Sequence, residues 1–394
     1  MVQTRRALLG GLATAAAAGL AGCNALQRGD ERRVVEPASG AWATRYGGGR
    51  GTAANDVAGV DRDPTRQWRE RTFPQYDAGV FTADGGGFVL DTHTLTAVNP
   101  DGSVRWRSEA GYYDPVVLAD EVVVAESMDG GLDALARSSG DRVWSVSGGE
   151  ALAVADQRLL ARTATETVAA VAPSGDAAWS ASEPASYSPV TAATQETVVA
   201  AFTDRYRAQP DTDGVAERST LVAYDAATGS EQWRFSVPGN VQRVAVHDDR
   251  VHVGTGVRDV NGAFGAFQHV LSLDDGSQEA RRTYTGVWFD GLAVDSEQAF
   301  TATGTTVRGL GPQLGGPNWE STLPARTTSL AAAASSVYVT WSPDEGTVVA
   351  ALDATSGEEQ WRKSLPVGWA EVVGVTDGRV FVETSETPGL YVLG

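Results

Sequence analysis

Two histidines flank a short acidic turn in the segment "HDDRVH", residues 247–252. His247 and His252 stand on either side of the turn, and Asp248 or Asp249 could supply a carboxylate as a third ligand. Histidine nitrogens together with a carboxylate are typical zinc ligands. An ordinary exposed β-turn explains the same residues without a metal, and we favour that interpretation. The sequence therefore predicts no metal site, and this turn is the place to check.

Other residues suited to catalysis form no recognisable pattern. Cys23 is the only cysteine, and the sequence has no Cys-x-x-Cys-His haem motif, no Gly-x-Ser-x-Gly elbow and no Walker loop. The segment "DTDGVAE" (211–217) lacks the length and the terminal glutamate of a calcium-binding loop. We therefore expect no catalytic residue, no cofactor and no enzymatic activity.

A repeated pattern of short strands must position whatever site the chain has. A tryptophan follows a glycine-centred turn in "SSGDRVW" (138–144), "ATGSEQW" (227–233) and "TSGEEQW" (355–361). The corresponding ends of the repeats are Trp68, Trp106, Trp144, Trp179, Trp233, Tyr284, Trp319 and Trp361. Their mean spacing, (361 − 68)/7 or about 42 residues, is that of a propeller blade.

Each repeat also contains a hairpin of apolar, β-branched runs separated by Asp, Gly or Ser, as in "QRVAVHDDRVHVG" (242–254). Four strands per repeat predict an all-β protein, an eight-bladed β-propeller of four-stranded antiparallel blades. The last repeat has no tryptophan strand, and the strand around Trp68 has no strands before it. We therefore expect the N-terminal strand to complete the last blade.

Acidic and aromatic residues lie where the first strand of each repeat begins. We call this end of the repeats the rim. We interpret this set as a candidate binding face, although acidic decoration and variation between loops is the alternative. The candidate residues are Tyr76, Asp77, Tyr112, Tyr113, Asp114, Glu150, Tyr187, Trp288, Phe289, Asp290, Trp369 and Glu371. Like charges around the rim would favour cations or a basic partner.

Two long connections are expected on the same rim, at about 203–219 and 257–269. The first is polar, and the second carries Phe264 and Phe267. Exposed aromatic residues on long loops are common in binding surfaces. The sequence thus favours binding of a protein partner at this rim.

The segments "AYDAATGSEQW" (223–233) and "ALDATSGEEQW" (351–361) resemble the repeat of the pyrroloquinoline quinone (PQQ) family of β-propellers, and "AWATRYGGGRGTAANDVAG" (41–59) resembles a lead-in to such propellers. The family contains quinoprotein dehydrogenases and the non-enzymatic BamB-type lipoproteins. The resemblance implies that the repeat tryptophans pack between blades. It also implies, for the enzymatic members, a vicinal cysteine pair and calcium, which a chain with one cysteine cannot match fully. We therefore expect the non-enzymatic type, with a small-ligand, metal or quinone-binding propeller as the alternative.

The composition indicates a salt-rich environment. Fifty acids face 31 bases, the net charge is −19, and Lys363 is the only lysine. A GC-rich genome would explain the arginines but not the acids, so a salt-loving, haloarchaeal cell is our interpretation. The acidic surface argues against a nucleic-acid partner.

The first residues resemble an export signal. Arg5 and Arg6 precede an apolar run, and small residues follow it up to Cys23. This order resembles a twin-arginine signal that ends in a lipobox, which implies lipid attachment at Cys23. We predict a signal at 1–22, a flexible tether at 23–41 and the propeller at 42–394. The expected product is a monomer that a lipid anchors to the cell membrane, on its extracytoplasmic side.

Overall fold

The computed structural model describes residues 41, 53–55, 57, 60, 64, 66–70, 76–91, 93–119, 121–172, 176–187, 189–204, 217–258, 264–343, 346–376, 378–384 and 389–394. At 55, 66–70, 76–78, 91, 114–117 and 258 only the backbone is described. The described residues belong to one compact unit, residues 35–394, and contain strands and turns but no helix. No helix long and apolar enough to cross a membrane therefore occurs in this part of the chain. The predicted signal, with Arg5, Arg6 and Cys23, lies outside it.

One long strand joins two four-stranded units into a seven-stranded sheet. Strand β6 is the last strand of the first unit and the first strand of the second, and the strands pair antiparallel in chain order. They are β3 (Tyr76–Phe81), β4 (Gly87–Asp91), β5 (Thr94–Val98), β6 (Val104–Leu118), β7 (Val122–Ser127), β8 (Gly131–Ala136) and β9 (Arg142–Val146).

Four further sheets each contain four consecutive antiparallel strands. The first two comprise β10 (Glu150–Ala155), β11 (Arg158–Ala164), β12 (Thr167–Val171) and β13 (Ala177–Ser182), then β14 (Val190–Ala193), β15 (Thr197–Asp204), β16 (Arg218–Asp225) and β17 (Glu231–Pro238). The next two comprise β18 (Asn240–His247), β19 (Arg250–Arg258), β20 (Phe264–Ser272) and β21 (Gln278–Thr285), then β22 (Phe289–Val294), β23 (Ala299–Thr303), β24 (Thr306–Leu310) and β25 (Pro317–Thr322).

The remaining two sheets each include a strand from the N-terminal region. Strand β1 (Ala54–Asn55) pairs in parallel with the first strand of one sheet, which comprises β26 (Thr327–Ala333), β27 (Ser336–Trp341), β28 (Thr347–Asp353) and β29 (Glu359–Leu365). Strand β2 (Arg66–Glu70) pairs antiparallel with the last strand of the other sheet, which comprises β30 (Ala370–Thr376), β31 (Arg379–Thr384) and β32 (Gly389–Leu393).

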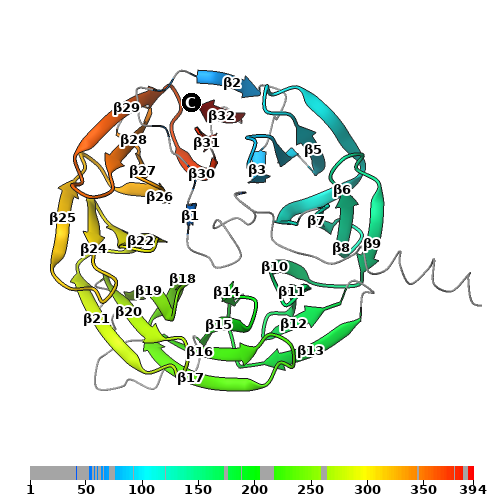
Figure 1. Ribbon diagram of the computed structural model, residues 1–394, viewed down its shortest axis with the longest axis horizontal. Coiled ribbons are helices and arrows are strands. Elements are labelled where there is room, and N and C mark those ends of the chain that lie inside the picture. The colour runs from blue at the N-terminus through cyan, green and yellow to red at the C-terminus, as the bar shows by residue number, and fades with distance from the viewer. Residues whose placement is uncertain are drawn as a thin grey trace, which may run out of the picture. The chain divides into compact units, whose positions relative to one another are not determined.

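Within this unit the sheets are arranged as the blades of a β-propeller. The first strand of each sheet lies toward the middle and the last at the periphery (Figure 1), and first strands of consecutive sheets touch, as β14 touches β18 and β22 touches β26. We call the strands of a unit A to D from the middle outward. The B–C and D–A connections share one end, the rim, and the A–B and C–D turns share the other.

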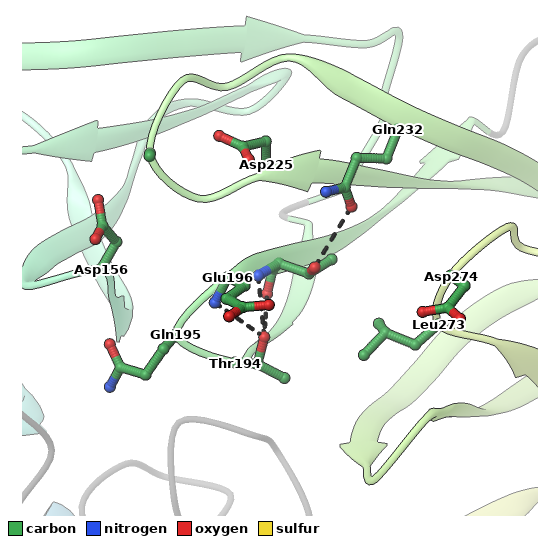
Figure 2. Close-up of a pocket in the computed structure, with 10 residues that line it drawn as sticks. Asp156, Thr194, Gln195, Glu196, Asp225, Gln232, Leu273 and Asp274 are labelled. Carbon is green, nitrogen blue, oxygen red and sulfur yellow. Dashed lines mark hydrogen bonds between the residues drawn. The ribbon is translucent and has the colours of Figure 1, made fainter.

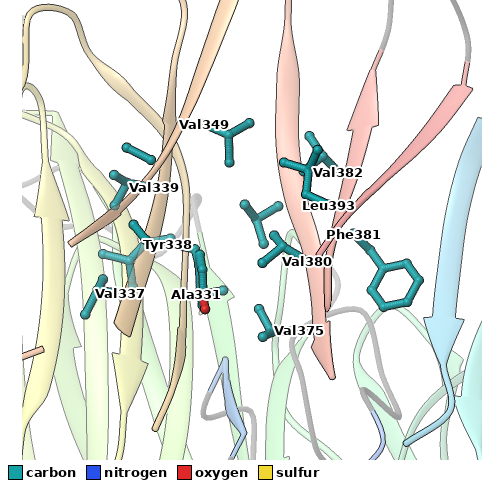
Figure 3. Close-up of a cluster of buried hydrophobic side chains, with 14 of the residues drawn as sticks. Ala331, Val337, Tyr338, Val339, Val349, Val375, Val380, Phe381, Val382 and Leu393 are labelled. Atoms are coloured by element: carbon teal, nitrogen blue, oxygen red, sulfur yellow. The ribbon is translucent and has the colours of Figure 1, made fainter. Parts of the chain in front are cut away.

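The position of a strand in its sheet explains its sequence pattern. All five residues of β23 and of β32 are buried, because these strands are covered on both faces by neighbouring sheets. Figure 3 shows such a layer, in which Val349 of one sheet faces Val380 of the next, while Val337 and Val339 lie on the other face of their sheet. By contrast, the D strands β13, β17, β25 and β29 alternate, with the repeat tryptophan as a buried residue.

Four of the repeat tryptophans bind the C–D turn of the following unit. The indole Nε1–H of Trp179 donates to the carbonyl of Ala226 at 2.8 Å, and that of Trp319 donates to Ala354 at 2.8 Å. Trp106 and Trp233 donate in the same way to Arg137 and Leu273. Each tryptophan thus joins two copies of the repeat, and the buried donor is satisfied.

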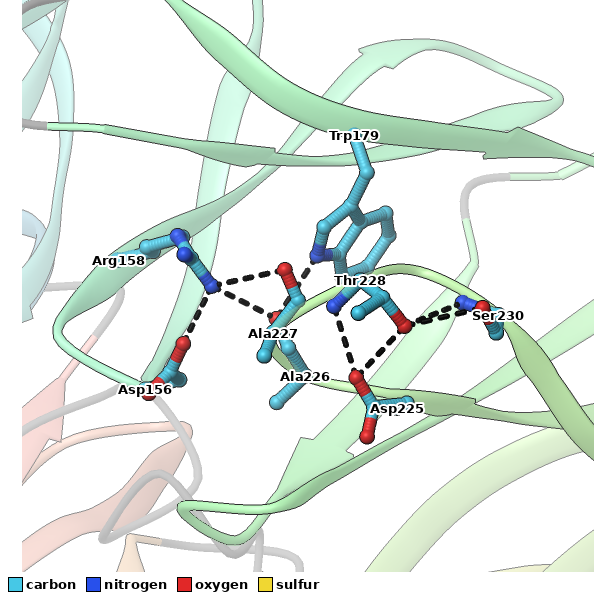
Figure 4. A network of polar contacts seen from close by, with 8 residues as sticks. All are labelled: Asp156, Arg158, Trp179, Asp225, Ala226, Ala227, Thr228 and Ser230. Carbon is cyan, nitrogen blue, oxygen red and sulfur yellow. Dashed lines mark hydrogen bonds and ion pairs between the residues drawn. The ribbon is translucent and has the colours of Figure 1, made fainter.

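The turn that receives the tryptophan is built by its own side chains. Asp225 accepts hydrogen bonds from the backbone N–H and the hydroxyl of Thr228, at 2.8 and 2.7 Å (Figure 4). The Arg158 guanidinium of the preceding unit, which is also paired with Asp156, donates to the carbonyls of Ala226 and Ala227. The same short segment of the repeat therefore forms the turn and also makes the contact with the neighbouring sheet.

Glycine is required at position 229 in this turn, because Gly229 has a φ of +71° and an added Cβ would lie 2.6 Å from the Trp179 ring. We expect Gly229→Ala to lower the free energy of unfolding by about 3 kcal/mol, of which about 1 comes from the backbone and the rest from displacing the indole. Gly378 has a φ of +65° with no atom within 4 Å of an added Cβ. Gly378→Ala is thus the matched control, with an expected loss of about 1 kcal/mol in urea denaturation. Equal losses in both variants would contradict the packing role.

Candidate functional site

A pocket of about 500 Å³ opens on the rim between the sheet of β18–β21 and the sheet of β22–β25. Its lining comes from the start of β20, from the D–A connection before β22, from the B–C turn of the latter sheet, and from the connection before β26. The lining residues are Phe264, Gly286, Val287, Trp288, Gly304 and Arg326. A concave site of this volume is in the range used for ligands or for a partner's side chains.

Two aromatic residues form one wall of this rim pocket. Phe264 is 48% exposed, and its ring meets the Trp288 ring edge to face, with centroids 5.6 Å apart. The N–H of Gly286 donates to the carbonyl of Phe264 at 3.0 Å, which ties the connection before β22 to the start of β20. Gly256 leaves room for the indole, since an added Cβ would lie 2.8 Å from the Trp288 ring. The wall is therefore held by backbone contacts rather than by a loose loop.

An ion pair forms the opposite side of the pocket. The Nε–H and Nη2–H of Arg326 donate to one oxygen of Asp290, the first of these at 3.0 Å, and the N–H of Gly304 donates to the other oxygen at 2.6 Å. The Asp290 side chain is only 5% exposed, whereas that of Arg326 is 62% exposed. Burial raises the pKa of Asp290, while the bonds from Arg326 and Gly304 oppose that rise. Asp290 thus positions both Gly304 and Arg326.

The rim carboxylates that the sequence grouped are not a ring of bare negative charge. Asp290 is paired with Arg326, and Glu150 accepts from Nε of Arg162 at 2.8 Å. Burial and the charge of Glu150 raise the pKa of the neighbouring Glu126. Glu371 lies in β30, half-buried and opposite Glu383. The side chains of Asp77 and Asp114 lie outside the described residues. Arginine pairing therefore weakens the expected attraction for cations at two of these positions.

The predicted rim aromatics divide into exposed and buried residues. Tyr113 is 47% exposed beside His93, and Tyr187, Trp288 and Trp369 are half-buried. The expectation of exposure is wrong for Tyr112 and Phe289, which are both 2% exposed. Strand alternation turns these two inward: the Tyr112 hydroxyl reaches Asp133 at 3.2 Å, and the Phe289 ring fills the space above Gly254. The side chain of Tyr76 lies outside the described residues.

The two connections expected to be long are partly strand. Thr203 and Asp204 end β15, residues 205–216 lie outside the described residues, and β16 begins at Arg218. In the second connection, β19 runs to Arg258 and β20 begins at Phe264. Phe267 therefore lies within a strand, on the opposite face from Phe264, under the Arg281 guanidinium at 4.3 Å.

Four residues of the rim pocket were not identified from the sequence. Gly286, Val287, Gly304 and Arg326 come from two connections and one turn that carry no chemical motif. The available signal was positional, because Val287 and Arg326 lie shortly before the first strands of consecutive repeats. Their meeting with Phe264 depends on contacts between two sheets.

The histidine turn shows no metal geometry. His247 pairs across the hairpin with Arg250 and His252 with Ala245, and His252 is buried with a pKa lowered to about 4 by desolvation and by the charges of His247 and Arg250. In the described parts of the chain, no three His, Cys, Asp or Glu residues group closely enough to hold a metal ion.

A second pocket, of about 620 Å³, lies at the opposite end of the sheets, among the A–B and C–D turns (Figure 2). Asp156, Glu196, Asp225 and Asp274 contribute carboxylates to it, and Gln232 reaches Thr197 at 3.4 Å. The hydrogen bond from Thr228 lowers the pKa of Asp225. Asp225 holds its C–D turn and Asp156 pairs with Arg158. We regard the rim pocket, which has an exposed aromatic wall, as the candidate site.

Comparisons with known proteins agree with this architecture. Solved structures with the same fold include BamB from Moraxella catarrhalis (16% identity over 84% of this chain and 99% of that chain, TM-score 0.59) and the quinohemoprotein alcohol dehydrogenase from Comamonas testosteroni (12% identity, 90% and 80% coverage, TM-score 0.65). A computationally designed protein, Ika8, is also similar (13% identity, 86% and 99% coverage, TM-score 0.62). At these identities the likeness concerns the fold alone.

Sequence comparison identifies the family. No curated protein sequence matches the chain significantly. A family model described as "Outer membrane protein assembly factor BamB" matches residues 53–160, 164–329 and 303–393, which together span nearly all of the described unit. The chain therefore belongs to the BamB family of PQQ-type β-propellers.

Proposed function

We propose that this protein is a non-catalytic β-propeller that binds another extracytoplasmic protein through the rim pocket and acts as a scaffold in the assembly of surface or membrane proteins. The observation that carries the proposal is the pocket between Phe264 and Arg326 on a propeller of the BamB family. Its exposed aromatic wall and backbone-held shape are features of protein-docking sites. Family membership supports a protein partner over a nucleic acid.

The propeller is proposed to have eight blades, with the N-terminal strand completing the last one. Two observations support this arrangement: β2 pairs with β32, and the first strand β30 of the last sheet contacts β3 of the first. In addition, Trp361 donates its indole N–H to the carbonyl of Val60 at 2.7 Å, across 301 residues. Val60 precedes β2 as Ala226 and Ala354 precede their D strands, so the N-terminal segment supplies the turn that the last repeat lacks.

Lipid attachment at Cys23 and an extracytoplasmic location in a salt-rich cell are part of the same proposal, and they rest on the sequence of the first residues and on the acid excess. Quinone catalysis is not proposed, although quinoprotein dehydrogenases share the fold. The chain has one cysteine, and the rim acids Glu150 and Asp290 are paired with arginines.

Capture of partners from native membranes, after cross-linking in molar salt, tests the proposal. We expect the wild-type protein to recover a specific membrane or surface protein, and Phe264→Ala to lower the recovery about tenfold by removing the exposed ring. Phe267→Ala is the matched control, since Phe267 lies on the same strand outside the pocket. Cys23→Ser, which should release the protein from membranes, checks the anchor. Recovery of the protein alone, or equal recovery with Phe264→Ala, would contradict the proposal.

A further inference from the structure

The guanidinium of Arg326 has hydrogen-bonding capacity that its ion pair does not use. Its Nε and Nη2 donate to the same Asp290 oxygen, whereas Nη1 has no partner among the described residues. The side chain is 62% exposed, so this unused edge faces the solvent at the rim pocket. An exposed guanidinium edge is suited to a planar carboxylate.

Among the described residues that line the pocket, Arg326 is the only charged one. The other walls are two aromatic rings, a valine and two glycines, so the interior suits an apolar side chain. A cation at the mouth would repel a basic group and attract an acidic one. The chain has 50 acids and 31 bases, so acidic residues predominate in it. A positive charge beside an apolar cavity differs from that pattern.

Asp290 holds the Arg326 side chain in place, while the positive charge of the guanidinium stays exposed at the surface. Its carboxylate lies beneath the guanidinium, 5% exposed, and is also held by the N–H of Gly304. Gly304 in turn accepts from the N–H of Thr327, the residue after Arg326, at 2.9 Å. The arginine is therefore fixed from both sides, and a second carboxylate can approach its outer edge without displacing Asp290.

We infer, on the basis of the proposed function, that the rim pocket recognises a protein segment in which a large apolar side chain is followed by an aspartate or glutamate. The apolar side chain packs against Phe264 and Trp288, and the neighbouring carboxylate accepts a hydrogen bond from Nη1 of Arg326. The pair sets the specificity of the site, because the aromatic wall selects size and the arginine selects charge.

Fluorescence polarisation with labelled peptides tests this inference. The probe is Gly-Ser-Gly-Phe-Asp-Gly-Ser-Gly, and its variants carry Ala for Phe, or Asn or Lys for Asp. We expect sub-millimolar binding of the probe, about tenfold weaker binding of the Ala variant, about fivefold weaker binding of the Asn variant and still weaker binding of the Lys variant. Phe264→Ala should weaken the probe about tenfold, and Phe267→Ala should leave it unchanged.

Arg326 is tested together with Asp290, because removing the arginine alone would leave a buried carboxylate unpaired. In the double variant Asp290→Asn/Arg326→Gln, we expect the Asp and Asn peptides to bind equally while the preference for Phe over Ala persists. A melting curve confirms folding. The inference is overturned if the wild type binds no peptide at 5 mM, or if it binds the Asp, Asn and Lys peptides alike. If partner capture still depended on Phe264, the proposed function would stand without this inference. If the peptide bound but no partner were captured, only the proposed function would be contradicted.

Discussion

Removing residues 1–70 is expected to lower the free energy of unfolding by about 6 kcal/mol relative to a protein that begins at residue 41. The loss includes the pairing of β2 with β32, the burial of Val60 and the acceptor of the Trp361 indole. A buried donor left unsatisfied costs about 1–3 kcal/mol, and the exposure of a buried valine costs about 1.5–3 kcal/mol. The open edge of β32, whose residues are all buried, accounts for the rest.

Thermal denaturation followed by circular dichroism measures this effect. For a domain of this size, the expected loss corresponds to a Tm lower by about 8 °C. A synthetic peptide of residues 53–70 should partly restore the Tm, because it can reoccupy the edge of β32 and the site beside Trp361. The proposed closure by the N-terminal strand would be wrong if the two proteins melted at the same temperature.

Acidification from pH 6.5 to pH 4 is expected to remove about 5 kcal/mol of stability through two buried histidines. His252 and His269 are each 2% exposed, and desolvation is the main cause that lowers the pKa of each to about 4 from a reference of 6.5. The charges of His247 and Arg250 lower the pKa of His252 further. The charge of Arg281 also lowers the pKa of His269, whereas its hydrogen bond with Gln278 raises it. Each shift corresponds to on the order of 3 kcal/mol.

The sign follows from proton uptake on unfolding. Between pH 6.5 and 4 the unfolded histidines bind protons that the folded ones do not, so stability is complete above pH 6.5 and lost as the pH falls to 4. Asp290 and Glu126 act in the opposite direction because burial raises their pKa values, but their shifts are smaller. Carboxylates with lowered pKa values, such as Asp353 at about 2, lose their contribution only at lower pH.

Urea denaturation at pH 7.5, 5.5 and 4.5 measures the dependence, with an expected slope of roughly 2 kcal/mol per pH unit near pH 5. The double variant His252→Gln/His269→Gln should lose most of this slope. His93→Gln is the matched control, because His93 is exposed. Should the double variant not fold, the wild-type slope still decides the question, and a flat profile between pH 6.5 and 4.5 would disprove the account.

The repeat was readable from the sequence because its contacts are local or recur at similar, though unequal, spacings. Trp179 and its acceptor Ala226 are 47 residues apart, and Trp319 and Ala354 are 35 apart. The alternation of buried and exposed residues in the D strands, and the Asp and Gly of each turn, can be recognised from the residues of a single repeat. The family resemblance implied that these tryptophans pack between blades. It did not show that they donate to the turn of the following repeat, since nothing within one repeat specifies its neighbour.

The candidate site was predicted in place but not in composition. Alignment of the repeats put Trp288 and Asp290 on the rim, where the pocket lies, and the connection with Phe264 on the same rim. It could not show that Phe289 and Tyr112 turn inward, because a strand's alternation does not say which face is covered until the sheets pack. Nor could it show that Arg326, 36 residues away, neutralises Asp290.

The sequence by itself indicated an all-β repeat protein, because strand periodicity, turn residues and a tryptophan recurring about every 42 residues are local properties. The PQQ type was implied by the resemblance of its repeats to that family. Only the tertiary structure decided which rim residues meet in a pocket, which carboxylates are paired with arginine, and that Val60 receives Trp361. These features depend on side chains from different sheets, up to 301 residues apart, whose meeting is specified by packing rather than by sequence proximity.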